Sequence, residues 1–206
     1  TGFGQDGPYA QRAGYDFAVQ GLGGLMSVTG AADGEPQKVG VAVADLFTGM
    51  YATVAILAAL RHRDATGEGQ AIDMALLDAQ VAMLANLGSH YLVGGEVPAR
   101  QGNAHANIVP YQVFAVADGH IIVAVGNDRQ FARLCELLGL AALGQDARFA
   151  ANAGRVRHRD ALIPVLQQAF RARDRHACLA SLEAAGIPCG PVNDLAEVFA
   201  DPQVRA

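Results

Sequence analysis

The pattern of apolar residues changes near Gly94, and this change divides the chain into two parts that must fold differently. Before it, apolar residues recur at helical spacing over residues 45–61, which predicts a buried helix, and again over about 76–93, where Gly94-Gly95 ends the helix. A short strand is expected at 71–74. We predict a first domain over residues 1–93, a linker over 94–100 and a second domain over 101–206.

The second part opens with a strong β-hairpin signal. Residues 111–117 and 120–125 are β-rich runs on either side of Asp118-Gly119, a dipeptide that favours a tight turn. Helices are expected at about 129–138, 158–172 and 174–185, then an extended piece at 187–192 and a last helix from near Asp194. The second part is therefore a module of a different kind from the first.

Composition argues against several classes of partner. The 206 residues are 51% hydrophobic, and no apolar run looks long enough to cross a bilayer, so we expect a soluble globular protein with no membrane partner. The net charge is −5 and the basic run 155–159 fits a solvated helix start, so no nucleic-acid surface is expected. Three widely spaced cysteines, Cys135, Cys178 and Cys189, suit buried thiols in a reducing compartment, which predicts a cytoplasmic protein.

Asp45 is a lone carboxylate inside the apolar run 40–50, between a β-branched stretch and the expected helix. A strand-to-helix junction exposes backbone N–H groups and the positive end of the helix dipole, so a carboxylate there tends to accept hydrogen bonds. Such a position suits a nucleophile, and it equally suits an ordinary helix cap. Position alone favours the cap, and both interpretations stay open at this point.

Familiar catalytic motifs are absent from the sequence. It contains no GxSxG elbow, Walker loop or HExxH, and its six histidines lack metal-ligand spacing, so no metal site is expected. His105 lies in the small-residue segment 102–107, a loop ahead of the hairpin whose polar groups could reach a ligand. An ordinary loop histidine fits the same residues.

Both ends of the sequence are abrupt. The opening Thr1-Gly2-Phe3-Gly4 looks like a loop that follows a buried strand, and residues 201–206 come just after a helical pattern. We therefore expect the chain to be a segment of a longer protein.

A set of segments in a fixed order carries a family resemblance. They are residues 1–9, 13–16, 40–49, 66–73, 102–105, 110–112, the pair Asp118-Gly119 and residues 190–192. In this order and spacing they resemble the family III CoA-transferases, also called the CaiB/BaiF family. The likeness covers essentially the whole chain.

This resemblance implies an α/β fold with two domains. A large CoA-binding domain with a Rossmann-like sheet is joined to a small α+β domain, and two subunits form an interlocked homodimer. Residues 1–93 would be the middle part of the large domain, and residues 101–206 the small one. No permanently bound cofactor is implied, because coenzyme A and acyl-CoA are substrates, together with a carboxylic acid.

The catalytic aspartate of the family falls on Asp45. In the scheme that the resemblance implies, its carboxylate attacks an acyl-CoA thioester to give a mixed anhydride, and the released CoA thiolate converts this to an aspartyl-CoA thioester. An incoming acid then reverses the steps. The chemistry needs no metal, but water must be excluded because an anhydride hydrolyses readily.

Ala13, Gly14, Tyr15 and Asp16 match a family segment that lies along CoA, so they are the predicted cofactor-binding residues. Position 15 also separates two reactions. The related 2-methylacyl-CoA racemases carry histidine there as the second base of a proton shuttle, whereas a tyrosine keeps its proton at neutral pH. Transfer is therefore favoured over racemisation. A third alternative is a non-catalytic acyl-CoA-binding relative in which Asp45 is only a cap.

Gly102, Asn103, Ala104 and His105 match a Gly-rich loop that covers the catalytic aspartate in the family, so they are the predicted substrate-binding residues. The loop here is not all glycine. Together with the residues that follow, it most resembles enzymes that move CoA between dicarboxylic acids such as succinate and glutarate or hydroxymethylglutarate. A second carboxylate needs a cation or a hydrogen-bond donor, and His105 and Arg100 are the nearby candidates.

Overall fold

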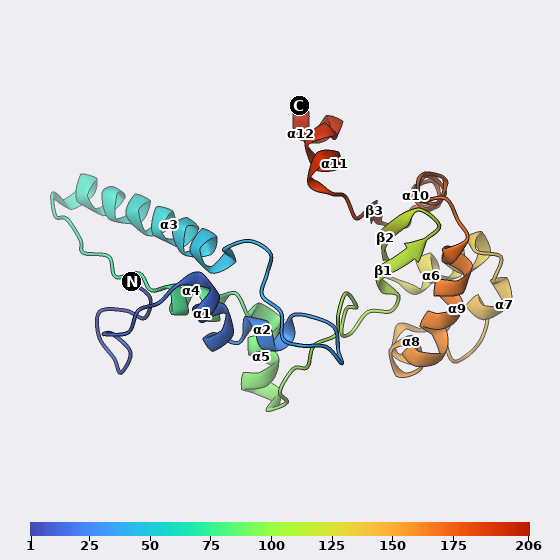
Figure 1. The fold of residues 1–206 in the computed structure, drawn as a ribbon, viewed down its shortest axis with the longest axis horizontal. Helices are drawn as coiled ribbons and strands as arrows, with labels where there is room; N and C mark the ends of the chain where they lie inside the picture. Colours follow the sequence, from blue (N-terminus) through green and yellow to red (C-terminus); the bar gives the residue numbers. More distant parts are fainter. The chain divides into compact units, whose positions relative to one another are not determined.

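A computed structural model describes residues 1–206 and divides the chain into two units, Thr1–Gly102 and Asn103–Ala206 (Figure 1). Helices form in both units, whereas strands form only in the second. The mixed α/β class predicted from the sequence is confirmed at this coarse level.

The first unit is built from helices alone. Its helices are α1 Asp16–Leu22, α2 Leu25–Val28, α3 Val43–Thr66, α4 Leu76–Ala82 and α5 Ala85–Gly94. Helices α1, α3 and α4 contact one another in pairs, and α2 packs on α1. The Rossmann-like sheet expected for this part of the chain is therefore not formed by its own residues.

The strand expected at residues 71–74 is absent because a strand needs a ladder of backbone partners. Here only the start of the chain reaches this segment. The Thr1 backbone nitrogen donates to the Met74 carbonyl oxygen at 2.9 Å, and the Leu76 N–H donates to the Thr1 carbonyl oxygen at 2.9 Å. These bonds join two extended segments without making a sheet. Residues 40–42, expected to be a strand end, are likewise irregular.

The helix expected over residues 76–93 is interrupted. Helix α4 ends at Ala82 and α5 begins at Ala85, whose φ of 46° lies in the left-handed region that a residue with a Cβ atom rarely adopts. The expected end is confirmed. Gly95 follows α5 with a φ of 74°, and its N–H donates to the Tyr91 carbonyl oxygen at 2.8 Å.

Helix α3 is the longest helix, and its apolar side chains are exposed. Ala44 is its one buried residue, while Met50 is 66% exposed and Leu57 is 62% exposed. The prediction of a buried helix is wrong here, because no other segment of the chain packs on these faces. At 24 residues α3 is also long and apolar enough to cross a membrane, which corrects the prediction that no such run exists. Length and composition alone do not separate a membrane span from a core helix.

The N-terminal loop packs closely on the segment that precedes α1. A Cβ atom at Gly14 would lie 2.6 Å from the Cα of Gly2, closer than such atoms approach in proteins. The Phe3 and Tyr9 rings meet edge to face with centroids 5.7 Å apart, and the Arg12 guanidinium lies 3.7 Å from the centre of the Tyr9 ring. Glycine at both positions lets the two backbones touch, and this contact fixes the start of α1.

The second unit contains a three-stranded antiparallel sheet in the order β1-β2-β3. The strands are β1 Tyr111–Val116, β2 Gly119–Ala124 and β3 Cys189–Pro191. Val116 pairs with Gly119 and Tyr111 with Ala124, so the chain reverses at residues 117–118. The predicted hairpin is confirmed, and the extended piece expected at 187–192 contains β3.

Helices complete the second unit. They are α6 Asp128–Leu137, α7 Ala141–Gly144, α8 Asn152–Arg157, α9 Arg159–Arg171, α10 Arg175–Ala184, α11 Leu195–Ala200 and α12 Pro202–Arg205. The expected helices correspond closely to α6, α9, α10 and α11. Three of these four helices start with ordinary caps, since Asn127 and Asp174 accept bonds from N–H groups of α6 and α10 and Asp194 of α11 forms a capping box with Glu197.

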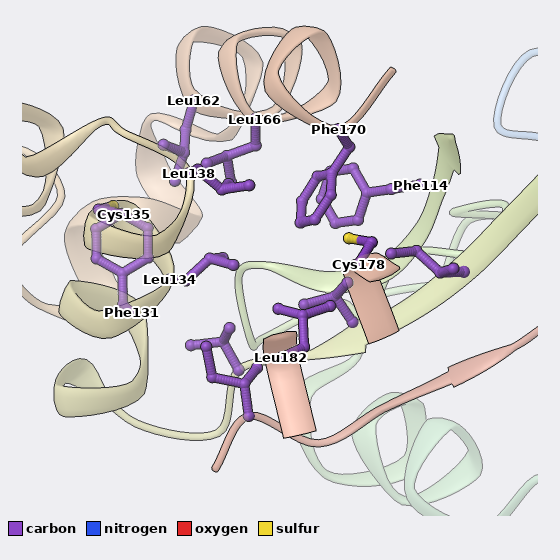
Figure 2. Close-up of a cluster of buried hydrophobic side chains, with 14 of the residues drawn as sticks. Phe114, Phe131, Leu134, Cys135, Leu138, Leu162, Leu166, Phe170, Cys178 and Leu182 are labelled. Carbon is purple, nitrogen blue, oxygen red and sulfur yellow. The ribbon is translucent and has the colours of Figure 1, made fainter. Parts of the chain in front are cut away.

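A continuous apolar core holds the second unit together (Figure 2). Phe114 of β1 and Phe170 of α9 are fully buried, with ring centroids 4.8 Å apart. Helix α6 turns Phe131, Leu134 and Cys135 into the same core at helical spacing. Burying one such side chain stabilises the fold by about 1.5–3 kcal/mol. The core therefore fixes the position of β1, which residues 103–110 directly precede.

Candidate functional site

Asp45 is the third residue of α3 and lies in its first turn. The residue in the N-cap position is Ala42, whose own side chain cannot accept a hydrogen bond. The Asp45 carboxylate is exposed and accepts no hydrogen bond from the rest of the chain. Of the two interpretations left open for Asp45, the ordinary helix cap does not hold, because the helix begins two residues earlier than the sequence pattern predicts.

Asp16 satisfies the first turn of α3 instead. Its Oδ1 accepts a hydrogen bond from the Ala44 N–H at 2.8 Å, and its Oδ2 accepts one from Gln20 Nε2 at 2.6 Å. The buried Gln20 in turn accepts a bond from the Val39 N–H at 2.9 Å. These bonds tie the start of α1 to the start of α3. They bring the predicted CoA-binding segment next to the turn that carries Asp45.

Tyr15 occupies the N-cap position of α1, and its side chain is 78% exposed. Ala13 is exposed and Gly14 is half-buried against Gly2. Of the four residues in the segment, Asp16 alone has its side chain committed to the fold. The structure thus leaves Tyr15 available to a ligand and gives Asp16 a structural role.

The predicted substrate loop is divided between the two units, since the first ends at Gly102. Gly102 donates its N–H to the Gly30 carbonyl oxygen at 2.9 Å and has a φ of 59°. Arg100 donates from Nε to the Ala31 carbonyl oxygen at 3.2 Å and from Nη2 to the Gly34 carbonyl oxygen at 2.7 Å. Its guanidinium group therefore holds the loop between α2 and α3.

Asn103, Ala104 and His105 belong to the second unit. His105 donates its backbone N–H to the Tyr111 carbonyl oxygen at 2.9 Å, and its ring lies 5.3 Å from the Tyr111 ring between centroids. Asn103 is exposed and Ala104 is half-buried. The loop is thus anchored at His105 to the first residue of β1.

The side chains of the chain are not arranged to hold a metal ion. No group of three or more His, Cys, Asp or Glu residues is placed for ligation. What the first unit does offer is a free carboxylate beside the positive end of a helix dipole. Such a group can act as a nucleophile or accept hydrogen bonds from a ligand.

Comparison with known proteins decides the family. The model of CoA-transferase family III matches residues 1–206. The chain belongs to this family. Among relatives of this family III chain, the succinate–glutarate CoA-transferase of Agrobacterium fabrum is 53% identical over 206 residues, which cover 100% of this chain and 52% of that protein. Human succinyl-CoA:glutarate CoA-transferase is 44% identical over 204 residues, covering 99% of this chain and 47% of that protein.

Solved structures agree with the family assignment. The crystal structure of a CaiB/BaiF family protein from Brucella suis matches the family III chain with a TM-score of 0.89 and 53% identity, over 100% of this chain and 54% of that one. The chain therefore spans about half the length of the relatives it matches.

Sequence reasoning missed residues that hold the backbone near the predicted site segments of each unit. In the first unit Gln20 contacts the backbone of Val39, and in the second Asn152 and Arg159 contact the backbone of residues 105–109. None of the three belongs to a recognisable motif. For Gln20 a local signal exists, because Asp16 and Gln20 are four residues apart on one helix face. For the others the bonds join residues more than forty positions apart.

Proposed function

We propose that this protein transfers coenzyme A from an acyl-CoA to a carboxylic acid, with Asp45 as the nucleophile. The observation that carries the proposal is the state of the Asp45 carboxylate, which lies exposed in the first turn of α3 while Asp16 satisfies that turn. A carboxylate that only capped the helix would have its oxygen atoms engaged by backbone N–H groups.

The proposed reaction balances without an outside reagent. An Asp45 oxygen attacks the thioester carbonyl carbon, the C–S bond breaks, and CoA leaves as a thiolate with a mixed anhydride left on the enzyme. The thiolate then attacks the Asp45 carbonyl carbon and releases the first acid as a carboxylate. The acceptor carboxylate reverses both steps, which regenerates Asp45 and forms the new acyl-CoA.

We place coenzyme A along the segment 13–16. The backbone of this segment is held by the close contact of Gly14 with Gly2 and by the hydrogen bonds of Asp16. The exposed Tyr15 side chain therefore projects from a fixed backbone. The same tyrosine argues against the racemase alternative, because that reaction needs a second base at this position.

A dicarboxylic acid is the proposed acceptor class. Two relatives are named for transfer between succinate or succinyl-CoA and glutarate. Of the two donors considered for the distal carboxylate, Arg100 is engaged with backbone oxygens of its own unit. His105 is the better candidate, and Asn103 and Ala104 would line the same face of the substrate.

The proposed assembly is a cytoplasmic homodimer. Its support is the family resemblance. The apolar surface of α3, where Met50, Val54 and Leu57 are each more than 60% exposed, needs a covering surface that this chain, about half the length of its relatives, does not itself supply. Light scattering on the full-length protein tests this directly, with twice the subunit mass expected and a monomer contradicting it.

The catalytic claim is tested by Asp45→Asn in the full-length protein. Asn keeps the shape of the side chain and removes the nucleophile, so transfer from succinyl-CoA to glutarate should be abolished with the melting temperature unchanged. Asp78→Asn is the matched control, because Asp78 is also exposed at the third position of a helix, α4. Full activity of the Asp45 variant would contradict the proposal.

A further inference from the structure

The backbone of residues 105–109 is held by side chains from a distant part of the second unit. Asn152, at the start of α8, accepts the Val109 N–H at 3.1 Å and donates to the Asn107 carbonyl oxygen at 2.8 Å. Arg159, at the start of α9, donates from Nη2 to the carbonyl oxygens of His105 and Ala106 at 2.7 and 2.8 Å. We call Asn152 and Arg159 the loop clamp.

Arg155 supports the base of the clamp between its two members. It is fully buried, and its Nε donates to the Val109 carbonyl oxygen at 2.6 Å while its Nη2 donates to Asp128 at 2.8 Å. Its guanidinium also lies 4.5 Å from the centre of the Phe131 ring. Arg155 therefore links the backbone next to the clamp to the apolar core through Phe131. Its bond to the Asp128 carboxylate is charge-assisted, and such bonds are stronger than neutral ones.

The clamp acts on His105 through the backbone. Because the Asn107 N–H donates to His105 Nδ1 at 3.0 Å, this ring nitrogen must be the acceptor, and the proton of the neutral ring lies on Nε2. His105 Nε2 has no partner within the chain. The ring therefore keeps an N–H donor at Nε2 that no group of the chain accepts.

We propose that Asn152 and Arg159 are positioning residues that fix the tautomer and direction of His105, so that Nε2–H meets the distal carboxylate of the acceptor. This inference rests on the proposed function and deepens it. Selection of the acceptor acid would then depend on a loop that hydrogen bonds hold in place within the second unit. A substrate loop held at several consecutive backbone groups cannot act as a freely mobile lid.

The test is a double-mutant cycle in the full-length protein. His105→Ala, Arg159→Met and the double variant are assayed with succinyl-CoA as donor and glutarate as acceptor. Arg157→Met is the control, since Arg157 is exposed at the end of α8 and makes no hydrogen bond. Asn152→Ala repeats the test from the other side of the clamp, and melting temperatures identify any variant that fails to fold.

We expect Arg159→Met to raise the KM for glutarate about tenfold, the effect of one lost charge-assisted contact, with the KM for succinyl-CoA unchanged. In the His105→Ala background the same change should alter the KM for glutarate by less than about twofold, because both act through one contact. The ¹⁵N chemical shifts of the His105 ring should show a single Nε2–H tautomer in the parent and a mixture in Arg159→Met.

The outcomes separate the two claims. If His105→Ala leaves the KM for glutarate unchanged, the substrate role of His105 is wrong and the positioning role falls with it. If His105→Ala raises this KM but Arg159→Met does not, the clamp alone is wrong. Equal effects of Arg159→Met in both backgrounds, or an unchanged tautomer, would also overturn the positioning role.

Discussion

Asp16 Oδ1 lies 2.8 Å from the backbone nitrogen of Ala44, the residue directly before Asp45. This bond gives the first turn of α3 its side-chain acceptor from another helix. The neighbouring Asp45 carboxylate is thereby left without a capping role. Asp16 takes the cap role that position alone favoured for Asp45, and the proposed nucleophile stays exposed.

Replacing Asp16 by Ala should lower the free energy of unfolding by about 1 kcal/mol, the usual effect of losing such an acceptor. The loss should come from the joined starts of α1 and α3, because Gln20 loses a partner as well. Chemical denaturation of the full-length protein measures it. Asp33→Ala is the control, since Asp33 is an exposed loop residue without a hydrogen bond. Equal stabilities of the two variants would contradict the role given to Asp16.

Gly14→Ala should destabilise the protein by about 1–3 kcal/mol, as expected for an atom forced into a packed contact. The new Cβ atom would lie 2.6 Å from the Cα of Gly2, so two backbones would have to separate. The matched change is Gly69→Ala, where nothing lies within 4 Å. Thermal unfolding compares them, and a Gly14 variant as stable as the Gly69 variant would show that the contact is not close.

Arg148 lowers the pKa of Asp146 from 3.8 to about 2 by hydrogen bonds from its side chain and its backbone N–H. Because the Asp146 pKa is lower in the folded state, the pair stabilises the folded state above pH 3.8. This contribution to the free energy of unfolding is lost as the pH falls through about 2. In Arg148→Met the Asp146 pKa should rise toward its ordinary value. An NMR titration of the carboxyl carbon measures it, and an unchanged midpoint would contradict the assignment.

Burial raises the pKa of the Cys135 thiol to about 11, against a smaller opposing effect of Arg155. The folded state therefore favours the protonated thiol. This contribution to the free energy of unfolding is present below pH 9.0 and lost as the pH rises through about 11.

At mildly alkaline pH an alkylating reagent should modify the partly exposed Cys189 before the buried Cys135 and Cys178. Peptide mass spectrometry follows the order, and equal rates in the native protein would contradict it.

The second unit could be predicted largely from its sequence because its signals are local. The hairpin forms where the sequence predicts it, with its turn at residues 117–118, one residue before the predicted Asp118-Gly119. Asn127 caps α6, and Asp194 with Glu197 forms a capping box within four residues. Helices α6, α9 and α10 and the first two strands also turn apolar residues toward one shared core. In this unit the local sequence preferences and the packing of the core favour the same helices and strands. The apolar periodicity therefore predicts these elements well.

The first unit was harder to predict because its elements depend on contacts that are distant in sequence. Residues 71–74 have strand-like composition but no strand partner, and α3 has core-like composition but most of its apolar side chains are exposed. Asp45 was identified from the family pattern, and its freedom from capping required the position of Asp16 in space. The clamp residues Asn152 and Arg159 belong to no motif, so their role could be found only in the structure.

The most direct test of the account is chemical trapping on Asp45. Full-length protein is incubated with succinyl-CoA and then hydroxylamine, which attacks the activated carboxyl carbon and leaves a hydroxamate in place of the displaced acid or thiol. Mass spectrometry should find the hydroxamate on the peptide that contains Asp45, and find none in the Asp45→Asn variant. An unmodified Asp45 peptide from an actively transferring enzyme, or a hydroxamate on another carboxylate, would contradict the assignment of Asp45 as the nucleophile.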